Sequence, residues 1–308
     1  MKAAMIEKNG GPEALIHGEL PDPIAGPGEV VVDIHAASIN AADWKVRADE
    51  YGGLSLTFPY VLGRDFSGLI SALGDGVDDF AVGDSVFGVC DVGQEGAYAE
   101  KIAIKAAIIA RKPDTLSHMA AAALALTGLT ATVSIEDTLK LQSGETILIQ
   151  GGAGGVAGFA IELAKHLGAH VITTASAANH DYLRGLGADQ IIDYNSEDFT
   201  AVVSGCDAVF ETVGGDVAEK SFDVLKPGGR AAFIASGSTA PEPARGDVTA
   251  LRTAVGRDRE HLERIAELVA LGAVGIPPIT EYPLSEAAAA HRVSEARHLK
   301  GKLVFKVR

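Results

Sequence analysis

Apolar and polar positions follow two different rhythms along the chain. Up to about residue 117, short apolar runs are separated by turn formers; the run at residues 30–38, for example, follows a Gly-Pro-Gly turn at residues 26–28. Short apolar runs bounded by glycine-rich turns are typical of β-strands joined by tight connections. The first part of the chain is therefore predicted to be a mostly antiparallel β domain.

From about residue 144 the pattern becomes strand, helix, strand. Residues 146–150 form a continuous apolar run, which is typical of a strand buried on both faces. From Val156 to Leu167 apolar residues recur at helical spacing, which predicts one buried helix face. Further strands are expected at residues 170–175, 190–193, 207–212 and 230–236, and further helices around residues 181–186 and 260–271. Because right-handed crossovers place helices on both faces, this alternation predicts a doubly wound parallel sheet.

The chain ends in one more apolar run, residues 303–307. A lone terminal strand needs a partner for its backbone groups, so we expect it to rejoin the first domain. The predicted fold class is α/β. It combines a mostly antiparallel β domain at residues 1–117, completed by residues 272–308, with a parallel-sheet domain at residues 118–271.

Composition and charge narrow the choice of function. Hydrophobic residues make up 47% of the 308 residues and charged residues 22%, which is typical of a folded globular protein. Lys plus Arg total 26 and Asp plus Glu total 41, giving a formal net charge of −15. A surface this acidic repels phosphate backbones, so nucleic acid is not expected as a partner.

Neither the N-terminus nor the longest uncharged stretch predicts a membrane protein. The first residues carry a charge every few positions, unlike a secretory signal. Residues 115–135 lack Asp, Glu, Lys and Arg but are rich in Ala and Thr, which favours a closely packed buried helix over a membrane span. Cys90 and Cys206 are too few for a disulfide framework. We expect them to be buried, small apolar residues in a cytoplasmic protein.

A glycine-rich loop joins the strand at residues 146–150 to the helix that follows. From Gly152 it matches the dinucleotide fingerprint G-x-G-x-x-A. A pyrophosphate must approach backbone N–H groups at the positive end of the helix, and side chains there would hold it away. The loop therefore predicts dinucleotide binding, with a purely structural turn as the alternative; a P-loop is disfavoured because Phe159, not Lys, follows the last glycine. The expected cofactor-binding residues of the loop are Gly152, Ala153, Gly154, Gly155 and Val156.

The end of the second parallel strand indicates which dinucleotide binds. NAD enzymes usually place an acid there to hold the ribose 2′-hydroxyl, but no acid occurs between Glu162 and Asp181. The absence of that charge favours NADP(H). Ala177 and Ala178 stand where a basic residue would be useful, so the available donors for a 2′-phosphate are Ser176, Asn179, His180 and Arg184.

The sequence resembles the medium-chain dehydrogenase/reductase superfamily over essentially its whole length. The matching segments are residues 26–30, 40–47, 59–68, 83–88, 96–100, the glycine loop, 213–215 and 301–304. The resemblance implies a GroES-like β domain, a Rossmann domain and catalysis in the cleft between them. Residues 237–255 do not align securely with the family.

The zinc ligands of the superfamily are missing from this chain. Zinc-dependent members carry Gly-His-Glu where this sequence has Gly63, Arg64 and Asp65, and residues 40–43 contain no Cys in place of the first ligand. Leu126 and Thr127 occupy the region of the third ligand. Because a catalytic zinc needs three protein ligands around an open position, no metal is expected.

Within the superfamily the chain is most similar to the zinc-independent quinone oxidoreductases, the zeta-crystallin-like branch. The match includes Asn40, Asp43, Arg47 and Tyr51. The implied reaction is hydride transfer from NADPH to a quinone or to the β-carbon of an enone. Without a Lewis acid, negative charge on the substrate oxygen must be met by hydrogen-bond donors and water.

The resemblance implies catalytic roles for Asn40, Tyr51 and Arg64. Asn40 and Tyr51 are the candidate donors, and Arg64 is expected to approach the cofactor or the cleft. The alternatives are a satisfied loop amide for Asn40, a ring with its hydroxyl in solvent for Tyr51, and a surface ion pair with Asp65 for Arg64.

Further cofactor contacts are implied outside the glycine loop. Thr127 is expected to bond the nicotinamide ribose or carboxamide because the superfamily's helix start lies there; the alternative is packing in the Ala-rich helix. Tyr194 is a candidate neighbour of the 2′-phosphate, and Val213 a backbone contact to a ribose. Ser236 and Gly237 are expected beside the nicotinamide ring.

The leading hypothesis is a zinc-free, NADPH-dependent quinone or enone reductase that acts on small molecules as a homodimer, the dimer being implied by the resemblance. A second hypothesis is an alkenal or enoyl-thioester reductase on the same scaffold. A third is a sensor or structural protein that binds NADPH with little turnover.

Overall fold

The computed structural model describes residues 1–52, 54–235, 239–297 and 299–308, and its contacts divide the chain into two units. The first unit comprises Met1–Leu126, Arg257–Glu267 and Ile276–Arg308, and the second comprises Thr127–Gly256 and Leu268–Gly275. Two helices, α2 (His118–Thr132) and α7 (Arg259–Ala270), contribute residues to both units.

The first unit is built on a mostly antiparallel sheet. Among the described residues its strand order is β15-β16-β3-β5-β6-β8, with β7 also paired to β3. The strands are β3 (Glu29–Ile39), β5 (Asp65–Leu73), β6 (Ser85–Val89), β7 (Lys101–Lys105), β8 (Ile109–Arg111), β15 (Ile279–Pro283) and β16 (Lys302–Lys306). A smaller sheet has the order β2-β1-β4, formed by β1 (Lys2–Ile6), β2 (Leu15–Glu19) and β4 (Tyr60–Val61).

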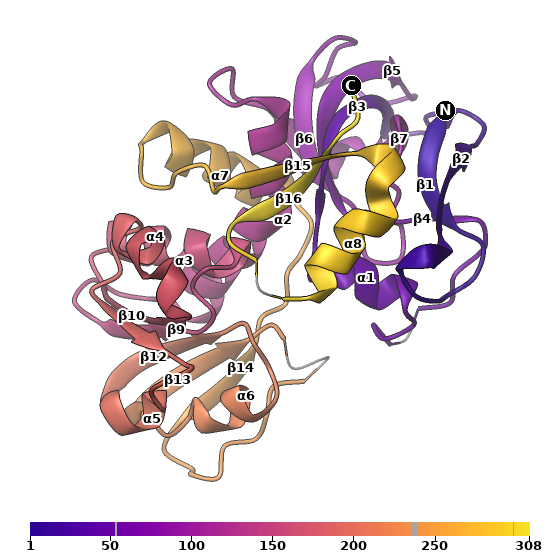
Figure 1. Ribbon diagram of the computed structural model, residues 1–308. Helices are drawn as coiled ribbons and strands as arrows, with labels where there is room; N and C mark the ends of the chain where they lie inside the picture. Colours follow the sequence, from indigo (N-terminus) through magenta and orange to yellow (C-terminus); the bar gives the residue numbers. More distant parts are fainter. Residues whose placement is uncertain (53, 236–238, 298) are drawn as a thin grey trace. The chain divides into compact units, whose positions relative to one another are not determined.

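The C-terminal strand returns to the first unit, as the sequence predicts. Strand β16 pairs antiparallel with β3, with Val304 opposite Ser38, and Figure 1 shows it beside that strand. The helices α1 (Ala41–Arg47) and α8 (Ala287–Glu295) belong to the same unit. Short 3₁₀ turns lie at Pro12–Ala14, Ala106–Ile108 and Leu284–Glu286.

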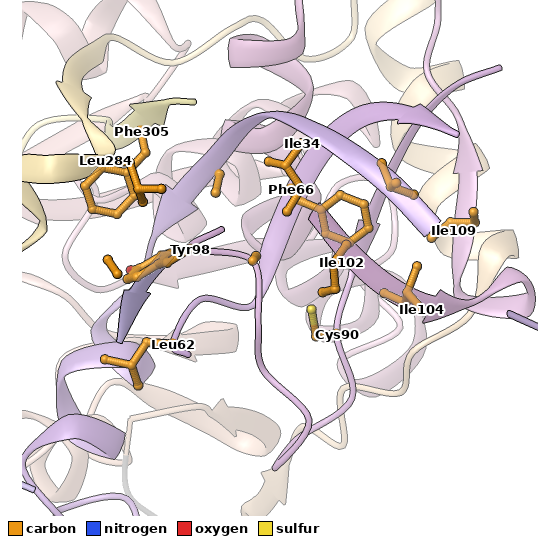
Figure 2. Packing of buried hydrophobic residues seen from close by; sticks show 14 of the residues in the cluster. Ile34, Leu62, Phe66, Cys90, Tyr98, Ile102, Ile104, Ile109, Leu284 and Phe305 are labelled. Carbon is orange, nitrogen blue, oxygen red and sulfur yellow. The ribbon is translucent and has the colours of Figure 1, made fainter. Parts of the chain in front are cut away.

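One hydrophobic cluster forms the core of the first unit (Figure 2). Phe305 of β16 meets the ring of Tyr98 edge-on at a centroid distance of 4.7 Å, a favoured geometry for aromatic pairs. Tyr98 is fully buried. A buried phenol hydroxyl needs a hydrogen-bond partner, so this core must contain polar groups.

The second unit is a parallel sheet with the order β11-β10-β9-β12-β13-β14 in the described part of the chain. Its strands are β9 (Thr146–Ile149), β10 (His170–Ala175), β11 (Gln190–Asp193), β12 (Cys206–Glu211), β13 (Leu225–Phe233) and β14 (Thr249–Arg252). Its helices are α3 (Gly155–His166), α4 (His180–Gly185), α5 (Phe199–Val202) and α6 (Asp216–Lys220). Figure 1 shows α3 and α4 on one side of this sheet and α5 and α6 on the other, which confirms the predicted doubly wound fold.

Helix α2 is the predicted uncharged helix, and it continues into a π-helical segment, Val133–Thr138. By length and composition, His118–Thr138 is apolar enough to cross a membrane, with a mean hydropathy of 1.5. However, 89% of that stretch's most apolar window is buried inside the protein. The prediction of a closely packed buried helix is confirmed.

Candidate functional site

The glycine loop connects β9 to α3 at the carboxyl edge of the parallel sheet. Gly154 is the N-cap of α3, with φ −74° and ψ 157°. The tight turn lies earlier than the fingerprint predicts, because the residue with left-handed backbone is Gly151, at φ +72°. Only glycine adopts that conformation without cost. Gly151 lies in the loop directly before the matched Gly152, but it was not among the predicted cofactor-binding residues.

Gly152 and Gly154 are needed for different reasons. A Cβ atom on Gly152 would stand 2.2 Å from the hydroxyl oxygen of Thr173 on β10, whereas a Cβ on Gly154 would meet its nearest neighbour at an ordinary 3.5 Å. Gly152 therefore permits close packing of the loop against the next strand. Gly154 leaves space where a side chain would otherwise stand at the start of the helix.

The start of α3 is suited to an anion. The first backbone N–H groups of a helix have no partner within the helix, and here they belong to Gly155, Val156 and Ala157. The aligned peptide dipoles add partial positive charge at this end. A diphosphate fits such a terminus, and the residues predicted to bind it, Gly152 to Val156, lie together there.

The other predicted nucleotide contacts follow the ends of neighbouring strands. Ser176 follows β10 and caps the short turn Ala177–Asn179, where the Asn179 side-chain amide donates to the serine hydroxyl at 3.3 Å. Tyr194 follows β11 and is half exposed. Val213 follows β12, and its side chain lies 3.1 Å from the position of a Cβ on Gly151. Carboxyl ends of parallel strands share one edge, so these residues and the loop occupy one region.

Four predicted contacts remain, namely Arg184, Thr127, Ser236 and Gly237. The Arg184 guanidinium is exposed on α4 and pairs with Asp181. Thr127 is buried, but it lies well inside α2, which begins at His118; the premise that a helix starts at Thr127 is wrong, and its predicted nucleotide contact stays untested. Ser236 and Gly237 lie outside the described residues.

A buried acid holds the segment after β12. Glu211 Oε1 accepts hydrogen bonds from the backbone N–H groups of Val213 at 2.6 Å and Gly214 at 2.7 Å. Its side chain is fully buried, and burial raises its pKa while those two N–H groups oppose the rise. Sequence reasoning missed Glu211. An acid directly after the apolar run Ala208–Phe210 is the signal that would have identified it.

In the first unit, Asn40 lies at the junction of β3 and α1 with both ends of its side-chain amide engaged. Its Nδ2 donates to Asp65 Oδ1 at 2.8 Å. Its Oδ1 accepts from Lys302 Nζ at 2.6 Å. Lys302 and Asp65 are 5% and 0% exposed, and neither was proposed from the sequence as a functional residue. Asn40 itself is partly exposed.

A second polar chain crosses the core beside Asn40. Arg47 Nη1 contacts His291 Nδ1 at 2.9 Å, His291 Nε2 contacts the Tyr98 hydroxyl at 3.3 Å, and that hydroxyl donates to Asp43 Oδ2 at 2.7 Å. Because Arg47 is only a donor, His291 carries its proton on Nε2. Burial raises the pKa of Asp43 to about 7. Burial, with the nearby Arg47 charge, lowers the pKa of His291 to about 3.

Arg64 is buried rather than exposed. It forms an ion pair with Glu95, whose side chain is 0% exposed, at 2.9 Å from Nη2 and 3.0 Å from Nε. Its Nη1 donates to the Tyr51 hydroxyl at 3.0 Å, and the guanidinium carbon lies 4.3 Å from the Tyr51 ring centre. The alternative of a surface pair with Asp65 is wrong, because Asp65 is buried and bonds Asn40. Since the hydroxyl accepts from Arg64, its own proton is available for another acceptor.

Among the residues that the structure describes, no three His, Cys, Asp or Glu side chains are grouped so that they would hold a metal ion. Cys90 and Cys206 are both buried, free thiols, which confirms their predicted placement. Zinc independence stays a prediction.

Known protein families and relatives match both the N-terminal and the C-terminal parts of the chain. Residues 26–114 match the family model for the alcohol dehydrogenase GroES-like domain, and residues 186–305 match that for zinc-binding dehydrogenase. The 2-haloacrylate reductase of a Burkholderia species is 31% identical over 330 residues, covering 98% of both chains. The chloroplastic NADPH-dependent alkenal/one oxidoreductase of Arabidopsis thaliana is 30% identical, covering 99% of this chain and 79% of the relative.

A solved structure of the same size is also similar. The quinone oxidoreductase from Coxiella burnetii superposes with a TM-score of 0.91 at 35% identity, covering 100% of this chain and 99% of that one. A much longer relative, a mycocerosic acid synthase-like polyketide synthase of Mycobacterium tuberculosis, is 33% identical; the chain spans only 14% of its length.

Proposed function

The chain belongs to the medium-chain dehydrogenase/reductase superfamily, and we propose that it transfers a hydride from NADPH to a quinone or an α,β-unsaturated carbonyl compound. The glycine loop carries this proposal, because it leaves the start of α3 bare at the carboxyl edge of a parallel sheet. The full-length relatives named for alkenal, haloacrylate and quinone reduction support the same reaction class.

The second unit binds the nucleotide. N–H groups of Gly155 and Val156 would bind the diphosphate, and Glu211 holds the Val213 backbone, the proposed contact to a ribose. Bound NADPH supplies the hydride from C4 of its nicotinamide ring. Strand β10 ends at Ala175 without a carboxylate of its own, and Ser176 and Asn179 are the proposed donors to the 2′-phosphate.

The first unit stabilises the oxygen of the substrate. As the carbonyl compound accepts the hydride at carbon, negative charge moves onto its oxygen, and donors that meet this charge lower the barrier. Asn40 and Tyr51 supply these donors in our proposal. Arg64 orients the Tyr51 hydroxyl through its hydrogen bond and ring contact. The reaction needs no metal in this scheme.

The test is NADPH oxidation by purified protein with 1,2-naphthoquinone, 9,10-phenanthrenequinone and a panel of enones, after treatment with EDTA. Consumption of NADPH at a rate unchanged by EDTA, in protein free of stoichiometric zinc, supports the proposal. Fluorescence-detected NADPH binding without consumption across the whole panel would instead support a sensor. Lack of affinity for any pyridine nucleotide overturns both.

We also propose that the protein is a cytoplasmic homodimer. Two free, buried cysteines suit a reducing compartment. The dimer rests on the family resemblance, and sedimentation equilibrium of the NADPH-bound protein tests it.

A further inference from the structure

The side-chain amide of Asn40 lies between two buried groups of opposite charge. Lys302 Nζ is 2.6 Å from the amide oxygen, and Asp65 Oδ1 is 2.8 Å from the amide nitrogen. Lysine is only a donor, and an ionised carboxylate is only an acceptor. The orientation of the amide is therefore unambiguous: its oxygen faces Lys302 and its nitrogen faces Asp65.

The fold fixes both charged groups. Asp65 begins β5 and is opposite Ser38 in the pairing with β3. It accepts from the Ser38 hydroxyl at 2.7 Å and from the Leu126 N–H at 3.3 Å. Lys302 begins β16 on the other side of β3 and also donates to the Ile39 carbonyl at 2.8 Å. Asn40 directly follows β3, which ends at Ile39, so the strands on the two sides of β3 bring the two charged groups to its amide.

Removing the Lys302 ammonium and the Asp65 carboxylate from water costs free energy, and this cost is offset only if the two charges stabilise each other through the Asn40 amide. Burial raises the pKa of Asp65, while Lys302, Ser38 and Asn40 oppose the rise. Burial lowers the pKa of Lys302, while Asp65 opposes the fall. If Asn40 served only to cap the helix that follows β3, its amide would not need a buried cation on one side and a buried anion on the other.

The arrangement changes the chemistry of the amide. The Lys302 cation at the oxygen draws electron density from nitrogen toward oxygen, whereas the Asp65 anion at one N–H holds the amide in its orientation. Hydrogen bonds in such a chain strengthen one another in a low-dielectric interior. Nδ2 has two hydrogens, and Asp65 takes one of them. Because Lys302 lies at the amide oxygen, the second N–H is a stronger donor than that of an asparagine without such a cation.

We propose that Lys302 and Asp65 are positioning residues that lock and polarise the Asn40 amide, so that its second N–H donates to the substrate oxygen. The inference rests on the proposed function. The hydride forms the new C–H bond at the β-carbon of an enone, the alkene electron pair moves to form an enolate, and the oxygen takes the charge. The enolate α-carbon then takes a proton from water.

A kinetic double-mutant cycle tests whether the lysine acts through the asparagine. Asn40→Ala is expected to lower kcat by roughly 10²–10³-fold. Lys302→Met is expected to lower kcat about tenfold with the NADPH Kd unchanged, and to cause no further loss in the Asn40→Ala background. Lys306→Met, an exposed change on the same strand, is the matched control. Equal losses from Lys302→Met in both backgrounds would overturn the inference.

A spectroscopic test needs no turnover. In ¹H–¹⁵N spectra of the full chain, the Asn40 side-chain protons are expected downfield of those of other asparagines, and Lys302→Met should move them upfield. Lys302→Arg, which keeps the cation, should preserve most of the shift and of kcat, and it serves where Lys302→Met does not fold. Asn40 resonances that do not respond to Lys302 overturn the inference. Absence of NADPH oxidation by the wild type overturns the proposed function instead.

Discussion

Gly152 lies so close to Thr173 that a methyl group on the glycine would stand 2.2 Å from the threonine hydroxyl oxygen. The contact fixes the glycine loop against β10. Gly152→Ala is therefore expected to lower the free energy of unfolding by about 1–3 kcal/mol, as other overpacking substitutions do. Urea unfolding measures the change.

The neighbouring Gly154 provides the control. Its Cβ would meet no atom closer than 3.5 Å, so Gly154→Ala should change stability by less than about 1 kcal/mol. It should still raise the NADPH Kd, by about tenfold, because the methyl group stands at the helix start. Adding Thr173→Ala to Gly152→Ala should restore part of the lost stability. Equal destabilisation by the two alanines would contradict the assignment.

Cofactor preference is expected to depend on the charge after β10. Ser176→Asp should weaken NADPH binding about tenfold and leave NADH binding nearly unchanged, because a carboxylate repels the 2′-phosphate at short range. Ser176→Asn is the neutral control of matching size. Competitive titration of both reduced cofactors measures the effect. If the aspartate and the asparagine weaken NADPH equally, charge is not the cause.

The buried Arg64–Glu95 pair should be sensitive to loss of one partner. Glu95→Gln leaves the guanidinium buried beside a neutral group and is expected to cost about 3–5 kcal/mol. The pair of Arg184 and Asp181 is exposed, so Asp181→Asn should cost less than about 1 kcal/mol. The denaturant midpoints of the two variants and of the wild type measure these costs. A similarly small loss of stability in both variants would contradict the prediction, because it would show that the buried Arg64 charge does not need Glu95.

His291 should make stability fall with acid. Its pKa in the folded protein is about 3, below the usual value of about 6.5 in an unfolded chain. The unfolded state therefore takes up a proton first as the pH falls below about 6.5, and stability is lost down to about pH 3. Because one proton is involved, the free energy of unfolding changes by at most about 1.4 kcal/mol per pH unit.

The His291→Gln variant isolates this effect. The stability difference between wild type and variant should shrink between pH 6.5 and 4 and stay constant above pH 7.5. A difference between wild type and His291→Gln that is independent of pH would mean that His291 is accessible to protons in the folded state.

The strands that the sequence predicted best have apolar or β-branched residues at their centre. Strand β10 and strand β11 have their predicted bounds: β10 is buried along all but its first residue, and β11, although an edge strand, has two isoleucines at its centre. Strand β14 was missed: its four residues include Thr249 and Arg252 and none is fully buried. An edge strand that is half exposed lacks the apolar run on which the prediction depends.

Only part of the candidate site could be predicted from the sequence, because its residues are far apart along the chain. Asn40 was proposed from a matched segment, but its partners lie 25 and 262 positions away. Asp65 and Lys302 look like ordinary charged residues until the strand pairing places them on either side of β3. Burial, rather than residue type, distinguishes them, and burial is a property of the fold.

The position of β16 between β15 and β3 has a consequence for synthesis. Strand β7 pairs early with Glu29–Asp33 of β3, but Ala36–Ile39 of β3 keep an unpaired edge until β16, some 260 residues further along the chain, has been made. Unpaired edges invite association with other chains. Folding of the nascent N-terminal region is therefore expected to finish only after β16 has been made, when its stability and its complete set of charged partners arrive together.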